Sequence, residues 1–170
     1  NQSIKAICDT DWKDLTIIRL PEIPNFTLLV GWTGQVAITD SLIQATEKKR
    51  KVETDNAFYK EFLAKSHAIV QGLQNAWNNQ DIPALQEGIR ANRALLNEFA
   101  QVMQLEIETP ALQTLCNLAE QNGACAKTSG AGGGDCGICF TQNETQRQQI
   151  ETQWAKAQIQ VLPITIAEAW

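Results

Sequence analysis

No apolar run in this sequence of 170 residues approaches the ~18 to 20 residues that a membrane-spanning helix needs, so we expect no membrane partner. An excess of positive charge is also absent, because 14 Lys and Arg stand against 19 Asp and Glu and give a net charge of -5. This acidic balance argues against a nucleic-acid partner. An anionic ligand would therefore have to be bound by a local arrangement of donors.

Metal-binding residues are scarce. The single histidine is His67, which we expect at the surface or at a boundary, and no second cysteine pair accompanies Cys136 and Cys139, so no metal site is predicted. Residues around this C-x-x-C pair are typical of a strand, whereas a redox motif begins a helix. We interpret the cysteines as packing residues, with redox and metal roles as the alternatives. Free thiols are the expectation for all five: Cys8, Cys116, Cys125, Cys136 and Cys139.

An odd number of cysteines indicates a reducing compartment, and the expected location is cytoplasmic. The chain is 44% hydrophobic and 19% charged, which is typical of a folded globular protein. Its length fits one domain. The chain begins with Asn1 and has no signal-peptide pattern, so we expect it to be part of a longer protein.

Hydrophobic periodicity predicts the elements along the chain. The expected strands cover residues 15–20, 26–30 and 136–141, and a last strand contains Ile159, Val161 and Ile164. A helix is expected to begin near Thr39 and to end at the basic run 48–51, which we interpret as a solvated helix end. Strands at both ends with helices between them predict an α+β fold, in which an antiparallel sheet is covered by helices on one face.

The middle of the chain is expected to be antiparallel helices with short connections. Asp81, Thr109 and Asn143 are the expected N-cap residues of three helices, the first two because Pro83 and Pro110 follow them. The helix over residues 55–79 has an apolar stripe at helical spacing, which is the strongest helix signal in the chain. Its members are Tyr59, Phe62, Leu63, Ser66, Ile69, Val70, Leu73, Ala76 and Trp77.

A glycine-rich loop spans residues 128–135, and four of the ten glycines lie between Gly130 and Gly134. Glycine loses the most conformational entropy on folding, so such a cluster needs a reason, and close approach of a ligand to the backbone is the usual one. Successive N–H groups can surround an anion, and Lys127 and Ser129 add a cation and a hydroxyl. A flexible hairpin turn is the alternative, although it needs fewer glycines. The loop matches neither the Walker A nor the Rossmann pattern.

The segment from Lys127 to Ile138 resembles the third, C-terminal motif of the GHMP kinase superfamily. The segment from Leu29 to Thr39, with Val30-Gly31-Trp32-Thr33, is similar to the corresponding block of the phosphomevalonate kinase family. The resemblance covers essentially all of residues 1–170 but only the C-terminal half of those enzymes. It implies a GHMP kinase C-terminal domain, with a ferredoxin-like antiparallel sheet and a helical insert.

Members of that family transfer the γ-phosphoryl group of ATP to phosphomevalonate, in isoprenoid precursor synthesis, and use ATP with Mg²⁺. The Gly-Leu-Gly-Ser-Ser motif that binds ATP belongs to an N-terminal domain and has no match here. The resemblance therefore implies a missing partner domain, an isolated chain without activity, and self-association through an exposed domain face. The alternatives are mevalonate kinase, diphosphomevalonate decarboxylase, or a non-enzymatic module that binds a phosphometabolite.

The resemblance also implies which residues bind substrate and phosphate. Ser129 and residues 130–134 would border the phosphates of ATP and of the substrate, and Asp135 would orient the loop or a substrate hydroxyl. No catalytic residue and no metal ligand is assigned. The residues implied in binding are Trp32, Thr33, Thr39, Lys127, Ser129, Gly130, Ala131, Gly132, Gly133, Gly134 and Asp135.

Overall fold

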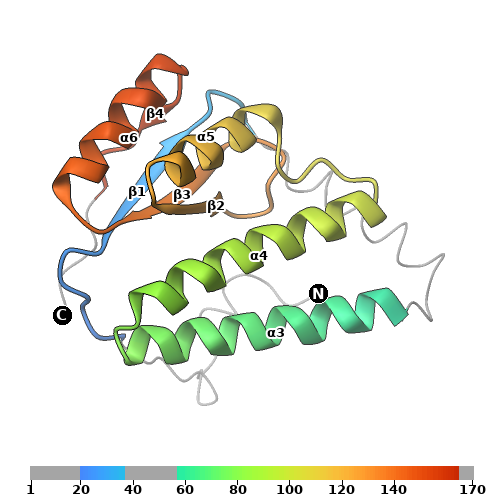
Figure 1. Ribbon diagram of the computed structural model, residues 1–170. Coiled ribbons are helices and arrows are strands. Elements are labelled where there is room, and N and C mark those ends of the chain that lie inside the picture. The colour runs from blue at the N-terminus through green and yellow to red at the C-terminus, as the bar shows by residue number, and fades with distance from the viewer. Residues whose placement is uncertain (1–19, 37–56, 165–170) are drawn as a thin grey trace, which may run out of the picture.

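The computed structural model describes residues 20–36 and 57–164 (Figure 1). The strand expected to begin at Leu15, the helix expected near Thr39, the basic run 48–51 and Cys8 lie outside the described residues. The elements are β1 (Thr27–Trp32), α3 (Ala57–Asn78), α4 (Ile82–Val102), α5 (Pro110–Gln121), β2 (Cys125–Thr128), β3 (Cys136–Thr141), α6 (Glu144–Lys156) and β4 (Gln160–Val161).

The four strands form one antiparallel sheet in the order β2-β3-β1-β4. Together with α5 and α6 this is the βαββαβ order of a ferredoxin-like fold. The α3–α4 hairpin is a helical insert between β1 and α5 (Figure 1). Helices α5 and α6 pack on one face of the sheet, and α4 lies along β2. The predicted α+β class, the ferredoxin-like sheet and the helical insert are all confirmed.

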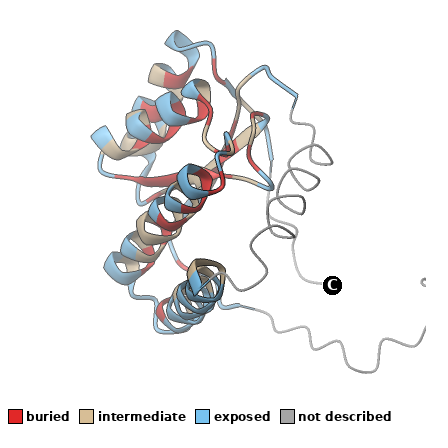
Figure 2. Ribbon diagram, turned by 90° about the vertical axis from the view of Figure 1, so that its right-hand side faces the viewer, coloured by how far each residue is buried: buried red, intermediate tan, exposed pale blue. Residues whose placement is uncertain are grey.

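The main core lies between the sheet and helices α5 and α6 (Figure 2). Leu29 and Cys139 are opposite each other in the register and are both buried on this face. Trp154 of α6 is fully buried, and its Nε1 donates to the Leu115 carbonyl at 3.0 Å. At Gly31 a Cβ atom would lie 2.8 Å from both the Leu115 Cδ1 and the Trp154 Cζ3, so the missing side chain is what lets the helices approach the sheet.

The N-caps predicted from sequence are confirmed. The side chains of Asp81, Thr109 and Asn143 accept from the backbone N–H three residues later, at 3.1, 3.4 and 2.9 Å. These bonds satisfy donors at the helix start that have no intrahelical partner. Local chemistry therefore sets where α4, α5 and α6 begin.

Helix α4 covers only part of the apolar stripe of α3. Leu63 is 48% exposed and Val70 is 55% exposed, and Ala76 is the buried residue of this helix. Figure 2 shows α3, the lowest helix, mainly in the exposed and intermediate colours. Leu63 and Val70 belong to the apolar stripe but remain exposed, because the described contacts of α3 are mainly with α4. His67 is exposed, as expected.

The last strand is shorter than predicted. Strand β4 pairs with β1 at Val161 and Gln160, and one further bond joins the Leu162 amide to the Val30 carbonyl at 2.9 Å. Pro163 has no N–H to continue the ladder. Ile164, which the alternation placed in the strand, is 45% exposed and lies outside it.

The described cysteines are free thiols that pack in the structure. Cys136 and Cys139 lie in β3 three residues apart, so they point to opposite faces as predicted. Burial raises the pKa of Cys116 to about 12 and the pKa of Cys125 to about 11. These thiols are poor nucleophiles at neutral pH, because the thiolate is the reactive form. The packing interpretation is confirmed for these residues.

Candidate functional site

The glycine-rich loop joins β2 to β3, and its backbone is left-handed over most of its length. The φ angles are 68° at Gly130, 79° at both Gly132 and Gly133, 127° at Gly134 and 62° at Asp135. Glycine adopts such angles at little steric cost, whereas other residues rarely do. At Gly132 a Cβ atom would also lie 2.6 Å from the Ile107 Cγ2. The glycines are therefore required by one specific conformation, and the alternative of a merely flexible turn does not fit.

Hydrogen bonds from outside the loop hold it at two points. The Gly133 amide donates to the Ile107 carbonyl at 2.8 Å, in the connection between α4 and α5. The Asp135 amide donates to the Gln35 carbonyl at 2.7 Å, and the Thr33 amide donates to the Asp135 carbonyl at 2.9 Å. The loop is thus fixed between the segment after β1 and the segment before α5, which Figure 1 shows at the same end of the domain.

The amides of Gly130, Ala131 and Gly134 are among the loop amides that donate to no residue that the structure describes. Gly130 and Ala131 are exposed, whereas Gly134 is buried. Free N–H groups on successive residues in such a conformation form a concave site for an anion. The loop can therefore bind phosphate oxygens through its backbone.

Lys127 and Ser129 lie at the start of this loop. Lys127 is half-buried in β2, its Nζ donates to the Thr128 carbonyl at 2.7 Å, and burial lowers its pKa. The Ser129 amide donates to the Cys136 carbonyl at 2.9 Å, which closes the β2–β3 ladder. No described carboxylate forms an ion pair with Lys127, so its ammonium group adds positive charge beside the loop.

The two sequence segments that carried the family resemblance meet in the structure. Trp32 pairs with Cys136 in the register of β1 and β3, and Thr33 follows at the end of β1. The Thr33 Oγ1 also donates to the Asp135 carbonyl at 2.9 Å. Thr33 therefore contacts the loop backbone, and Trp32 lies in the strand next to it. Thr39 lies outside the described residues.

A polar cluster that joins α4, α5 and the connection between them was not found from the sequence. The Arg93 guanidinium on α4 donates to both carboxylate oxygens of Glu108, at 2.8 and 2.6 Å, and also to Glu120 and Asn117 on α5. The Asn97 amide donates to Glu108 at 3.1 Å. The only sequence signal is spacing. Arg93 and Asn97 lie four and eight residues after the buried Ile89, and so near the same face of α4.

Charge within the cluster is well compensated. Burial alone would raise the pKa of Glu108, but the hydrogen bonds from Arg93 and Asn97 outweigh it and hold that pKa below its ordinary value. The hydrogen bond to Glu108 raises the pKa of Arg93. Both groups stay charged, which is the usual requirement for a buried ion pair.

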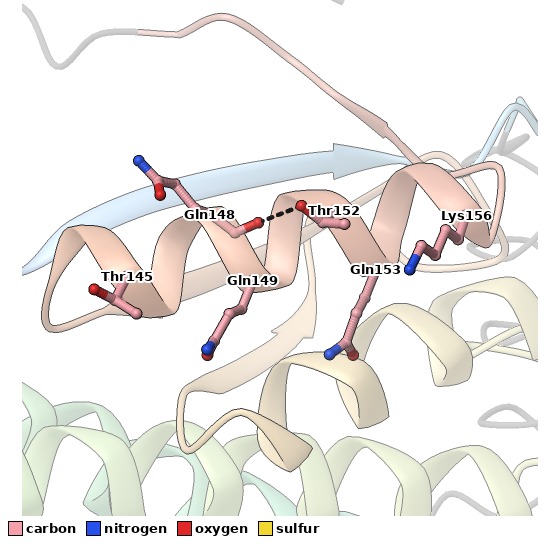
Figure 3. A pocket seen from close by; sticks show the side chains of 6 residues that line it. All are labelled: Thr145, Gln148, Gln149, Thr152, Gln153 and Lys156. Carbon is pink, nitrogen blue, oxygen red and sulfur yellow. Dashed lines mark hydrogen bonds between the residues drawn. The ribbon is translucent and has the colours of Figure 1, made fainter.

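Other parts of the described chain offer weaker sites. A depression along α6 is lined by Thr145, Gln148, Gln149, Thr152, Gln153 and Lys156 (Figure 3). Its side chains are amides and hydroxyls except for Lys156, and it includes no loop residue. Within residues 20–36 and 57–164, no group of three or more His, Cys, Asp or Glu could hold a metal ion. None of the helices described there is both long and apolar enough to cross a bilayer.

A ferredoxin-like α+β domain with a fixed, glycine-rich β2–β3 loop is the class that fold and site define. A family model for the C-terminal domain of GHMP kinases matches residues 69–160. This match covers more than half of the chain. The chain belongs to the GHMP kinase C-terminal family.

Individual proteins similar to this chain include phosphomevalonate kinases. A phosphomevalonate kinase of Streptomyces sp. (strain CL190) is 35% identical over 158 residues, which are 92% of this chain and 42% of that enzyme. A crystal structure of the Lin0012 protein of Listeria innocua has a TM-score of 0.84 at 31% identity, covering 95% of this chain and 45% of that one. Streptococcus pneumoniae phosphomevalonate kinase, in complex with phosphomevalonate and AMPPNP, has a TM-score of 0.69 at 30% identity.

The structural match to the pneumococcal enzyme covers 79% of this chain and 37% of the other. This chain thus spans less than half the length of each of these relatives.

Proposed function

We propose that residues 1–170 form the C-terminal domain of a phosphomevalonate kinase, which transfers the γ-phosphoryl group of ATP to phosphomevalonate. The observation that carries this proposal is the β2–β3 loop, whose free amides at Gly130, Ala131 and Gly134 can bind phosphate. The names of the Streptomyces and pneumococcal relatives support the choice of substrate. The reaction belongs to isoprenoid precursor synthesis, and we place it in the cytoplasm.

In this reaction a terminal oxygen of the phosphomevalonate phosphate attacks the γ-phosphorus of ATP. The bond between that phosphorus and the β,γ-bridging oxygen breaks, and ADP leaves with the electron pair, so the products are diphosphomevalonate and ADP. Phosphoryl transfer depends mainly on positioning and on electrostatic stabilisation. A rigid loop with fixed N–H donors supplies both for the phosphate oxygens.

The residues of the site have different roles, which are phosphate binding, positive charge and positioning of the loop. Backbone amides of Gly130, Ala131 and Gly134 bind phosphate oxygens, whereas the Gly133 amide is held by the Ile107 carbonyl; the Ser129 hydroxyl adds a donor, and Lys127 adds positive charge. Thr33 holds the loop, because its hydrogen bonds go to the Asp135 carbonyl, and Asp135 orients the loop or a substrate hydroxyl. Trp32 borders the site, and Thr39 is included on the family resemblance alone.

The rest of the site comes from an N-terminal kinase domain that binds ATP together with Mg²⁺. We place the Mg²⁺ ligands in that other domain, because the family resemblance assigns none to this chain. The 170-residue chain alone is then inactive. The face that this chain turns toward the N-terminal domain would self-associate when that domain is absent.

The test is a coupled ADP-release assay on the protein produced from the complete gene that encodes this chain. We expect kcat/KM for phosphomevalonate to exceed the values for mevalonate and diphosphomevalonate by at least about a hundredfold, because mevalonate lacks the phosphate that the site binds and diphosphomevalonate carries one phosphoryl group too many. The 170-residue chain alone serves as the control and should release no ADP. Preference for mevalonate, or release of ADP by the chain alone at a comparable rate, would overturn the proposal.

A further inference from the structure

The conformation of the glycine loop depends on a segment that lies outside both motifs. The Ile107 carbonyl accepts from the Gly133 amide at 2.8 Å, and the Ile107 side chain occupies the space beside Gly132. Ile107 belongs to the connection between α4 and α5, residues 103–109, which has no regular secondary structure. Something other than helix or sheet hydrogen bonds must fix this carbonyl.

Ile107 is buried in a cluster with Phe99, Ala100 and Met103, and the neighbouring residue adds a polar constraint. The side chain of Glu108 is 5% exposed, and both of its oxygens accept from Arg93, whose side chain is 13% exposed. The two parallel bonds are the fork geometry that guanidinium forms with carboxylate, which restricts orientation as well as distance. Arg93 also contacts Glu120 at 3.0 Å, so the same side chain joins α4, the connection and α5.

We infer that the Arg93–Glu108 ion pair is a positioning element for phosphate binding, and that it acts on the glycine loop through the Ile107 carbonyl. In its bearing on catalysis this inference rests on the proposed function. The pair contacts neither substrate nor reacting atoms. It fixes residues 107 and 108, the Ile107 carbonyl fixes Gly133, and the loop amides on either side are thereby held in place.

A general role in stability would give a different pattern. Removing one partner of a buried ion pair is strongly destabilising, so a pair that only stabilised the fold would speed exchange throughout the domain, β3 included, when Arg93 or Glu108 is replaced. Lysine cannot reproduce the fork of two parallel donors. Arg93→Lys therefore keeps the charge and removes the orientation, which separates positioning from simple charge compensation.

The first experiment measures hydrogen exchange of the Gly133 amide by NMR in the full chain. The variants are Glu108→Gln, which keeps the shape of the side chain, and Arg93→Lys. Arg147→Lys is the matched control, because Arg147 forms exposed ion pairs with Glu144 and Glu151 on α6. We expect Gly133 to exchange about tenfold faster in both variants, with β3 amides unchanged, and no change in the control.

The second experiment measures kcat and KM for phosphomevalonate in the protein from the complete gene. We expect Glu108→Gln to lower kcat about tenfold and to change KM less than twofold, because misplaced donors bind the ground state but stabilise the transition state poorly. The control should match the unmodified enzyme.

The two experiments separate the possible failures. An unchanged Gly133 exchange rate in folded Glu108→Gln and Arg93→Lys overturns the inference whatever the activity. Faster exchange with an unchanged kcat overturns the role in phosphoryl transfer. An unmodified protein that does not phosphorylate phosphomevalonate refutes the proposed function, and the exchange rates still decide whether the pair positions the loop.

Discussion

The amide and the hydroxyl of Thr33 both donate to the carbonyl oxygen of Asp135, each at 2.9 Å. Thr33 ends the Val30-Gly31-Trp32-Thr33 segment, and Asp135 ends the glycine loop, so these hydrogen bonds join two motifs that lie far apart in the sequence. The paired donors, together with the Asp135 amide bond to Gln35, fix the end of the loop where it enters β3.

Removing the Thr33 hydroxyl tests this contact. Thr33→Val keeps the shape of the side chain and removes the donor, whereas Thr33→Ser keeps the donor. We expect Thr33→Val to lower the free energy of unfolding by about 1 kcal/mol, the usual net value of one hydrogen bond, and to speed exchange of the Asp135 amide. Urea denaturation and NMR exchange measure both effects. Equal Asp135 exchange rates in the two variants would show that the hydroxyl does not hold the loop.

Gly132→Ala and Gly130→Ala form a matched pair within the loop. Both residues have positive φ, but a Cβ atom at Gly130 meets nothing within 4 Å, whereas at Gly132 it would meet Ile107. We expect Gly130→Ala to cost about 1 kcal/mol from backbone strain and Gly132→Ala about 3 kcal/mol from strain and steric overlap together. Denaturant unfolding measures the difference, and equal costs would contradict the close contact between the loop and Ile107.

A second glycine pair tests the packing of the core. Gly31→Ala would place a Cβ atom 2.8 Å from Leu115 and Trp154, so we expect a loss of about 1 to 3 kcal/mol from overpacking. Gly72 lies in α3 with nothing within 4 Å, so Gly72→Ala is expected to raise stability by up to about 1 kcal/mol through helix propensity. The sign of the change in Tm distinguishes the two variants. A Gly31→Ala protein at least as stable as the unmodified chain would contradict the packing of α5 and α6 on β1.

The pH dependence of stability reports on Glu108. Its pKa is lower in the folded chain than its ordinary value of 4.5, so below that pH the unfolded state binds more protons. The stability contributed by the ionised carboxylate is therefore fully present above about pH 4.5 and is lost as the pH falls through the lower, folded pKa. We expect the difference in unfolding free energy between the unmodified chain and Glu108→Gln to shrink over this range. A difference that stays constant between pH 7 and pH 3 would contradict the charged pair.

Local signals in the sequence predict the helix starts well. Asp81, Thr109 and Asn143 cap their own helices, and that chemistry depends on neighbours three residues away. The β1 and β3 strands and the presence of a glycine-rich loop follow for the same reason, because alternation and glycine content are local properties. The ferredoxin-like arrangement came from the family resemblance, since strand order depends on contacts between distant segments.

Contacts between distant segments explain what the sequence did not predict. Nothing in the pattern around Ile107 indicates that its carbonyl accepts from Gly133, and nothing around Arg93 indicates a partner at Glu108. Periodicity also cannot predict that Leu63 and Val70 are exposed. The apolar stripe shows which side of α3 is apolar, but not how much of that side α4 covers. Pro163 is visible in the sequence and has no N–H to continue strand pairing, and β4 ends before it at Val161.

The most direct test of the central claim follows the loop amides during ligand binding. The protein from the complete gene, labelled with ¹⁵N at glycine and alanine, is titrated with AMPPNP and phosphomevalonate. We expect the amide signals of Gly130, Ala131 and Gly134 to shift on saturation, whereas those of Gly72 on α3 and Gly88 on α4 should not. Binding of both ligands with unchanged loop signals would contradict the claim that this loop binds phosphate.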